Sequence, residues 1–222
     1  MRQDFERNLQ TIQGATLELG HSVEQALANA VDTLLTRNLE QASDIIEAIC
    51  TVVGPTRSNL EGEILALIAT QQPVAGDLRT LVALLEILAE LERMGNYAAS
   101  IAQATIRLNS QPPLEPLHQI IAAMGVKVKT MLGEALLALA RYDVALARSI
   151  PLADQAIDEL YEQLYQELLG VIRLTPQAAP QTTHLSRVAH NLERTADRVV
   201  NICEWIIFAA TGEMKELNAV AG

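Results

Sequence analysis

Apolar residues recur every three or four positions along almost the whole chain, and this spacing constrains the fold more than any other feature of the sequence. The spacing puts apolar side chains on one face of a helix, and that face must be buried against other helices. No convincing run alternates apolar and polar residues, and neither Asn-Gly nor Asp-Gly marks a hairpin. The sequence therefore predicts an all-α fold. The clearest runs are Leu78, Leu81, Val82, Leu85, Leu88 and Ala89, and Leu185, Val188, Ala189, Leu192, Ala196, Val199, Val200 and Cys203.

Helix-breaking residues divide the chain into six segments. Proline suits the first turn of a helix but not its interior, and the run Pro112, Pro113 and Pro116 is the densest break. We expect long antiparallel helices, as in a bundle. The Gly54-Pro55 pair falls inside the second segment and predicts a kinked or split helix there. The expected helices span residues 3–37, 39–71, 74–110, 115–141, 143–174 and 181–212.

Charge and composition exclude several classes of protein. The 222 residues carry a formal net charge of −11, whereas a nucleic-acid binder needs a basic footprint. The longest stretches without charge, such as 64–76, are too short and too polar to span a bilayer. Two cysteines without a C-x-x-C motif, and an N-terminus without an apolar signal region, favour a reduced compartment. We expect a cytoplasmic protein that binds no nucleic acid.

The two halves of the chain resemble each other. Leu91-Glu92-Arg93-Met94-Gly95-Asn96 and Leu192-Glu193-Arg194-Thr195-Ala196-Asp197 lie 101 positions apart. Each block falls in the third expected helix of its half, and a repeat of this length with two copies indicates a duplication rather than a solenoid. The sequence predicts two tandem three-helix bundles, the first over residues 1–111 and the second over residues 112–222.

Two pairs of acidic residues stand beside the apolar stripe of the second half. Glu193 and Asp197 are four positions apart on one helix, and Asp154 and Asp158 have the same spacing on another. Carboxylates held close together repel one another and favour a proton or a bound cation, and four of them would make a hard, oxygen-rich site. Two other outcomes stay open: a solvated acidic face, and neutralisation by salt bridges from Arg194 and Arg198.

A second pattern suggests a different chemistry. Glu18 and His21, and Glu115 and His118, both match Glu-x-x-His, which supplies ligands in di-iron four-helix bundles. The alternative function is therefore a di-iron carboxylate, ferritin-like enzyme. Pro116 puts the second motif at a helix start rather than mid-bundle, which weakens this alternative. A third reading is a helical adaptor without any ligand.

Several segments, taken in order, resemble the PhoU family. They are 72–79 (QPVAGDLR), 91–96 (LERMGN), 154–161 (DQAIDELY), 191–197 (NLERTAD) and 211–213 (TGE), and together they cover nearly the whole chain. No single segment is distinctive, but their order and spacing are. The resemblance implies two three-helix bundles, with a metal cluster on Glu/Asp-x-x-x-Asp motifs in each.

The motif carries over unevenly. Asp154 with Asp158, and Glu193 with Asp197, fit it in the second half. In the first half Glu92 fits, but Asn96 replaces the second acid, and residues 49–54 contain no acid where the partner motif is expected. We therefore predict a competent metal site in the second bundle and a degenerate one in the first. The metal would be a divalent or trivalent ion, Fe, Mn, Mg or Zn, and a site made only of carboxylates would also accept Ca.

The resemblance also implies a function. PhoU-like proteins are cytoplasmic negative regulators of phosphate uptake and of phosphate-starvation signalling. They act through contacts with the phosphate ABC transporter ATPase and a sensor histidine kinase, and reach the membrane only through these partners. The expected protein is therefore a homodimeric regulator of phosphate homeostasis without catalytic residues or an organic cofactor site.

Overall fold

The computed structural model describes residues 2–214, 216 and 217. The first half contains α1 (Arg2–Thr36), α2 (Leu39–Ala48), a π-helical turn η1 (Ile49–Val53), α3 (Gly54–Gln71) and α4 (Ala75–Leu108). The second half contains α5 (Glu115–Arg141), α6 (Val144–Ser149), the 3₁₀ turn η2 (Ile150–Ala153), α7 (Gln155–Leu174), the 3₁₀ turn η3 (Pro176–Ala178) and α8 (Ala179–Thr211). The all-α prediction is confirmed over the part of the chain that the structure describes.

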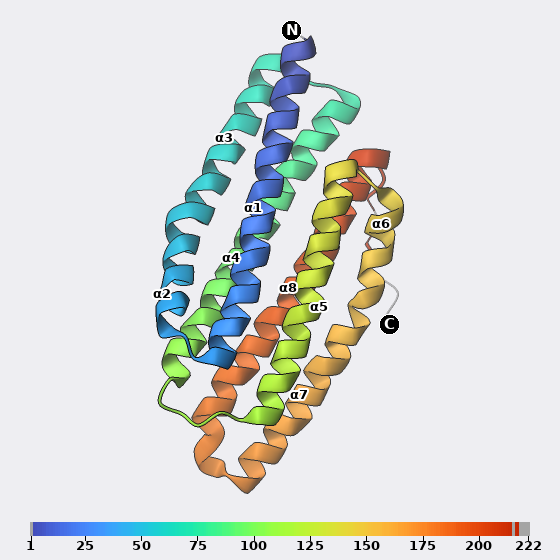
Figure 1. Cartoon of the computed structure of the whole chain (residues 1–222). Helices are drawn as coiled ribbons and strands as arrows, with labels where there is room; N and C mark the ends of the chain where they lie inside the picture. The colour runs from blue at the N-terminus through green and yellow to red at the C-terminus, as the bar shows by residue number, and fades with distance from the viewer. Residues whose placement is uncertain (1, 215, 218–222) are drawn as a thin grey trace.

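The helices form an elongated bundle with a central group and two outer edges (Figure 1). Helices α1, α4, α5 and α8 make up the central group, and α4 with α8 forms the most extensive contact between helices of the described chain. The α2–α3 segment lies along one edge, against α1 and α4, and α7 lies along the other, against α5 and α8. Each half is therefore a three-helix bundle, as predicted, and the two bundles pack against each other through their first and third helices.

The corner between the first two helices is built the same way in both halves. Arg37 and Tyr142 each end a helix in the left-handed conformation, with φ of 60° and 50°. The next residue then caps the following helix: Asn38 accepts from the N–H of Gln41 and Asp143 from that of Leu146. These caps satisfy a backbone donor that a helix start leaves unpaired. The shared corner supports the duplication inferred from sequence.

The second and fifth expected helices are both interrupted. Residues 39–71 form one helical segment that changes from α-helix to π-helix at Ile49–Val53. There the N–H of Gly54 donates to the carbonyl of Ile49, five residues earlier. Pro55 follows directly and has no N–H to donate, which confirms the interruption expected at Gly54-Pro55. The expectation of one helix over 143–174 is wrong. Pro151 breaks it into α6, η2 and α7, because a proline ring clashes with the carbonyl four residues earlier.

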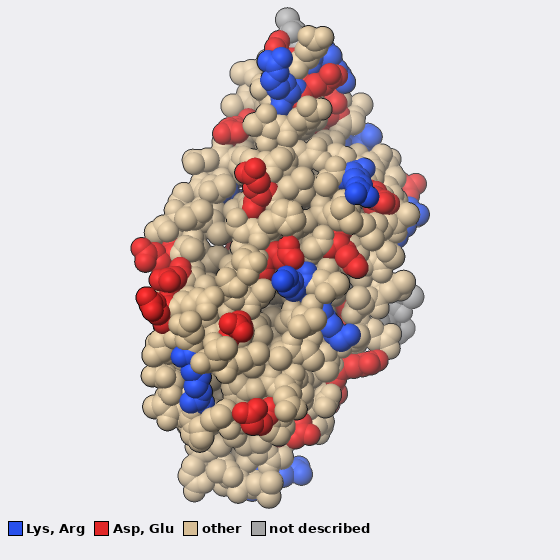
Figure 2. Space-filling view, viewed as in Figure 1, with Lys and Arg blue, Asp and Glu red and all other residues tan. Residues whose placement is uncertain are grey.

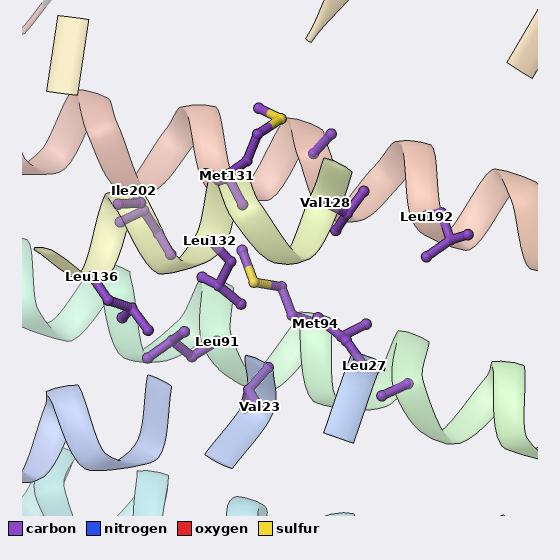
Figure 3. Close-up of a cluster of buried hydrophobic side chains, with 14 of the residues drawn as sticks. Val23, Leu27, Leu91, Met94, Val128, Met131, Leu132, Leu136, Leu192 and Ile202 are labelled. Atoms are coloured by element: carbon purple, nitrogen blue, oxygen red, sulfur yellow. The ribbon is translucent and has the colours of Figure 1, made fainter. Parts of the chain in front are cut away.

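One hydrophobic core runs through both bundles. Figure 3 shows its centre, where side chains from all four central helices meet. The labelled residues are Val23, Leu27, Leu91, Met94, Val128, Met131, Leu132, Leu136, Leu192 and Ile202, all buried. The apolar stripes read from the sequence are the faces buried here. Within residues 2–214 and 216–217, no helix combines the length and apolar character needed to cross a bilayer.

Candidate metal centre

Four acidic residues of the second half face one another where α7 packs against α8. Asp154 directly precedes α7, at the end of the η2 turn, and its carbonyl accepts the N–H groups of Ile157 and Asp158. Asp158 lies in the first turn of α7. Glu193 and Asp197 lie one turn apart on α8, beside the buried Leu192 and Ala196. Because Pro151 ends α6 and starts the turn that Asp154 closes, this break sets the position of Asp154 relative to α8.

Burial and mutual repulsion act together on these carboxyl groups. Burial raises the pKa of Asp154 to about 6, and the charges of Asp158, Asp197 and Glu193 add to the effect. The pKa of Asp158 is raised by burial and then by Asp197. The pKa of Glu193 is raised by burial and by Asp197, with Arg194 and Arg198 opposing the shift. The structure thus brings all four predicted acids into one electrostatic neighbourhood, and the charged forms of Asp154, Asp158 and Glu193 are disfavoured there.

The basic side chains nearby form only long contacts with these acids. His190 Nδ1 lies 3.4 Å from Glu193 Oε2, and Arg194 Nε lies 3.9 Å from Asp197 Oδ2. Glu193 Oε2 is buried and accepts no hydrogen bond. A buried carboxylate oxygen without a donor is costly, and a bound cation would satisfy it. The donor set therefore fits a hard metal ion. In residues 2–214 and 216–217, however, no three His, Cys, Asp or Glu side chains already converge with the geometry to hold one.

The corresponding region of the first half is built differently. Arg57 Nε on α3 lies 3.5 Å from Glu92 Oε2 on α4, and the Arg57 guanidinium also pairs with Glu61. Asn96 is exposed. Ile49 and Val53 pack against Gly95 on α4 with apolar atoms. Arginine and aliphatic side chains thus occupy this helix contact, and the degenerate first site stays a prediction.

A buried ion pair between the two halves was not found from the sequence. Glu90 on α4 is only 5% exposed, and its carboxylate receives Arg198 of α8 and Arg93 of its own helix. The available signal was a glutamate inside the otherwise apolar run Ile87 to Leu91. Buried carboxylates are almost always paired, so a glutamate at position 90 predicts a cationic partner.

The two Glu-x-x-His segments do not form a di-iron site. Gly20 packs against Leu136, and Gly125 against Val31, so α1 and α5 run antiparallel. His21 therefore lies near the level of Leu136, whereas His118 is roughly 27 Å away along the helix axis. His21 contacts Glu24 at the surface, and buried His118 donates through Nδ1 to the carbonyl of Leu114. Helix register separates the ligands that such a site would need.

The fold and site define a class: duplicated helical bundles whose halves share one core, with paired acidic residues between the second and third helices of the second half. A model described as the PhoU domain matches residues 16–105 and 121–206, one match in each half. The chain belongs to the PhoU family. The two matches agree with the duplication, and the boundary between residues 111 and 112 stays a prediction.

Relatives and solved structures match nearly the full chain. The phosphate-specific transport system accessory protein PhoU homolog of Streptococcus pneumoniae is 32% identical over 221 residues, covering 98% of this chain and 100% of the relative. The Aquifex aeolicus homolog is 32% identical, covering 94% and 93%. The crystal structure of PhoU from Pseudomonas aeruginosa has a TM-score of 0.90 at 27% identity, covering 94% of this chain and 100% of that one. The phosphate transport system regulatory protein PhoU from S. pneumoniae has a TM-score of 0.86 at 31% identity, covering 95% and 99%.

Proposed function

We propose that this protein is a non-enzymatic regulator of phosphate homeostasis that restrains phosphate uptake and phosphate-starvation signalling. The observation that carries the proposal is the family match in both halves, together with relatives named as accessory proteins of the phosphate-specific transport system over nearly their full length. The regulator acts in the cytoplasm by binding other proteins. Its partners are the ATPase of the phosphate ABC transporter and a sensor histidine kinase.

The architecture suits a binding role. Long helices present extended, stable faces, and the two outer edges of the bundle are free of other elements of the described chain (Figure 1). On the face that Figure 2 shows, acidic side chains gather over the α2 edge and the few basic ones are scattered. A face of this kind steers toward basic partner surfaces and away from nucleic acid. A homodimer is the assembly proposed for the active regulator.

A metal ion in the second bundle is part of the proposal. Asp154, Asp158, Glu193 and Asp197 are the ligands, and the unsatisfied Glu193 Oε2 is the observation that favours a cation there. The ion would relieve the mutual repulsion of the four carboxylates and hold α7 against α8. Its role is therefore to stabilise the second bundle in one arrangement rather than to catalyse a reaction.

Co-purification from cells grown at high and at low phosphate tests the proposal. The tagged full-length protein is recovered after brief in-cell crosslinking, and bound proteins are identified by mass spectrometry. We expect the transporter ATPase or a sensor kinase, with more recovered at high phosphate. An unrelated acidic helical protein with the same tag is the control. Recovery of neither partner under either condition would overturn the proposed function.

A further inference from the structure

A hollow of about 200 Å³ lies between α2, α4 and α8, away from the acidic residues of the second half. Ser100, Gln103 and Arg107 of α4 line it on one side, His184 and Arg187 of α8 on the other, and Ile46 of α2 contributes an apolar edge. We infer that this hollow binds a small tetrahedral oxyanion of the phosphate type. The inference goes beyond the proposed function and does not depend on which proteins the chain binds.

The charge of the hollow is opposite to that of the molecule. The chain carries 27 acidic and 16 basic residues, yet the lining contains two arginines and no acid. Arg57 and Arg198 elsewhere in the bundle have carboxylates within 4 Å. In residues 2–214 and 216–217, neither Arg107 nor Arg187 has such a partner. Two unpaired guanidinium groups at one hollow of an acidic protein make a local attraction for anions.

Ser100 lines this space, and its hydroxyl proton has no acceptor among the described residues. Asn191, 8% exposed, donates through Nδ2 to Ser100 Oγ over 2.9 Å, so the hydroxyl oxygen is already an acceptor. The hydroxyls of Thr16 and Ser22 donate to the carbonyl four residues earlier, which is the usual arrangement in these helices. Ser100 makes no bond of that kind in the described chain. Its proton therefore remains free for a ligand.

The donor set favours a tetrahedral ligand over a carboxylate. Each guanidinium offers a planar fork that binds two oxygens at once, and the two arginines belong to different helices. The Ser100 hydroxyl and the Gln103 amide add further donors. A phosphate or sulfate ion has four oxygens to meet these groups, whereas a carboxylate has two. Free phosphate and a phosphate ester share this chemistry.

Isothermal titration of the full-length protein tests the site at constant ionic strength. The probes are inorganic phosphate, sulfate, glucose 6-phosphate and acetate. We expect saturable binding of one phosphate per chain, and about tenfold or greater weakening in the Arg107→Gln/Arg187→Gln variant. Comparing inorganic phosphate with glucose 6-phosphate shows whether the hollow accepts the free ion or a phosphate ester. The inference is supported if either of these ligands binds more tightly than acetate does.

The control variant is Arg7→Gln/Arg148→Gln, which removes the same charge from exposed positions on α1 and α6. It should bind phosphate as the unaltered protein does, and circular dichroism verifies that both variants keep their helices. Absence of saturable binding to the unaltered protein overturns the inference. So does equal affinity for acetate, or an equal loss in both variants. Binding is measured without partner proteins, so this result stays separate from the co-purification result.

Discussion

Arg198 Nη1 on α8 lies 3.3 Å from Glu90 Oε2 on α4, and this pair joins the two bundles at their most extensive contact. The side chains are 15% and 7% exposed, so both charges are largely removed from water. Ser100 on α4 also bonds Asn191 on α8, which shows that these helices run antiparallel. The two contacts set the register of one repeat against the other with polar groups, within an otherwise apolar interface.

Substitution Glu90→Gln should lower the free energy of unfolding, because it leaves Arg198 without its carboxylate. Breaking one side of a buried pair costs about 3 kcal/mol, and the residual exposure of Arg198 reduces this to roughly 2 kcal/mol. Urea unfolding followed by circular dichroism measures the change. The matched control is Glu63→Gln, an exposed glutamate on α3, which should alter stability by less than about 0.5 kcal/mol. Equal effects of the two substitutions would show that the pair contributes nothing specific.

The protein purified without chelator should contain a metal ion, and removal of that ion should lower the melting temperature. Binding to the folded state at a hundredfold excess over Kd contributes about 2.7 kcal/mol, or roughly 5–10 °C for a chain of this size. Elemental analysis and thermal unfolding with and without EDTA measure both quantities. Glu193→Gln should abolish the chelator effect, whereas Glu92→Gln, its counterpart in the first bundle, should leave it intact. A metal-free protein with no response to EDTA contradicts the proposed site.

The pKa of Asp154, raised to about 6 by burial and then by the neighbouring carboxylates, sets a pH dependence for the metal-free protein. The folded carboxyl holds its proton up to about pH 6, whereas the unfolded one loses it near the ordinary aspartate pKa of 3.8. The folded state therefore binds more protons in this window, and the free energy of unfolding falls as pH rises through it.

Asp154→Asn should reduce this slope, to which Asp158 and Glu193 also contribute, and stabilise the metal-free protein at pH 7 by about 1 kcal/mol, after allowance for solvent screening. Urea titrations between pH 4 and pH 7 in EDTA measure it. Asp44→Asn, on the exposed side of α2, is the control and should keep the slope. A stability that rises between pH 4 and pH 7 in the unaltered protein, and equally in Asp154→Asn, would refute the assignment.

Two glycines of α1 should respond to alanine in opposite directions. A Cβ on Gly14 meets nothing within 4 Å, so Gly14→Ala should stabilise the helix by about 0.8 kcal/mol. A Cβ on Gly20 would overlap Leu136 Cδ2, and Leu136 is buried in the core between α1 and α5. Gly20→Ala should therefore destabilise by about 1 kcal/mol, the overpacking cost less the gain in helix propensity. Thermal unfolding of both variants shows whether each substitution raises or lowers the stability. If both substitutions stabilise the protein, Leu136 repacks freely around the added methyl group.

The sequence by itself determined the helices and the buried faces. Hydrogen bonds within a helix join residues four apart, so apolar periodicity and the breaks at Asn38, Pro55 and Pro112 were sufficient to predict most of the segments. The duplication was also readable, because Glu92 and Glu193 stand in matching sequence blocks. Pro151 also stands in the sequence, inside the helix expected over residues 143–174, but the break that it causes was not predicted.

Only the tertiary structure decided which charges meet. The spacing of Glu193 and Asp197 puts them on one face of α8, but their approach to Asp154 depends on how α7 is rotated and shifted against α8. The same holds for Arg57 beside Glu92, for Arg198 beside Glu90, and for the separation of His21 from His118. These contacts join residues far apart in the chain. Their register is set by how buried side chains of neighbouring helices interlock, which no pattern within a single helix specifies.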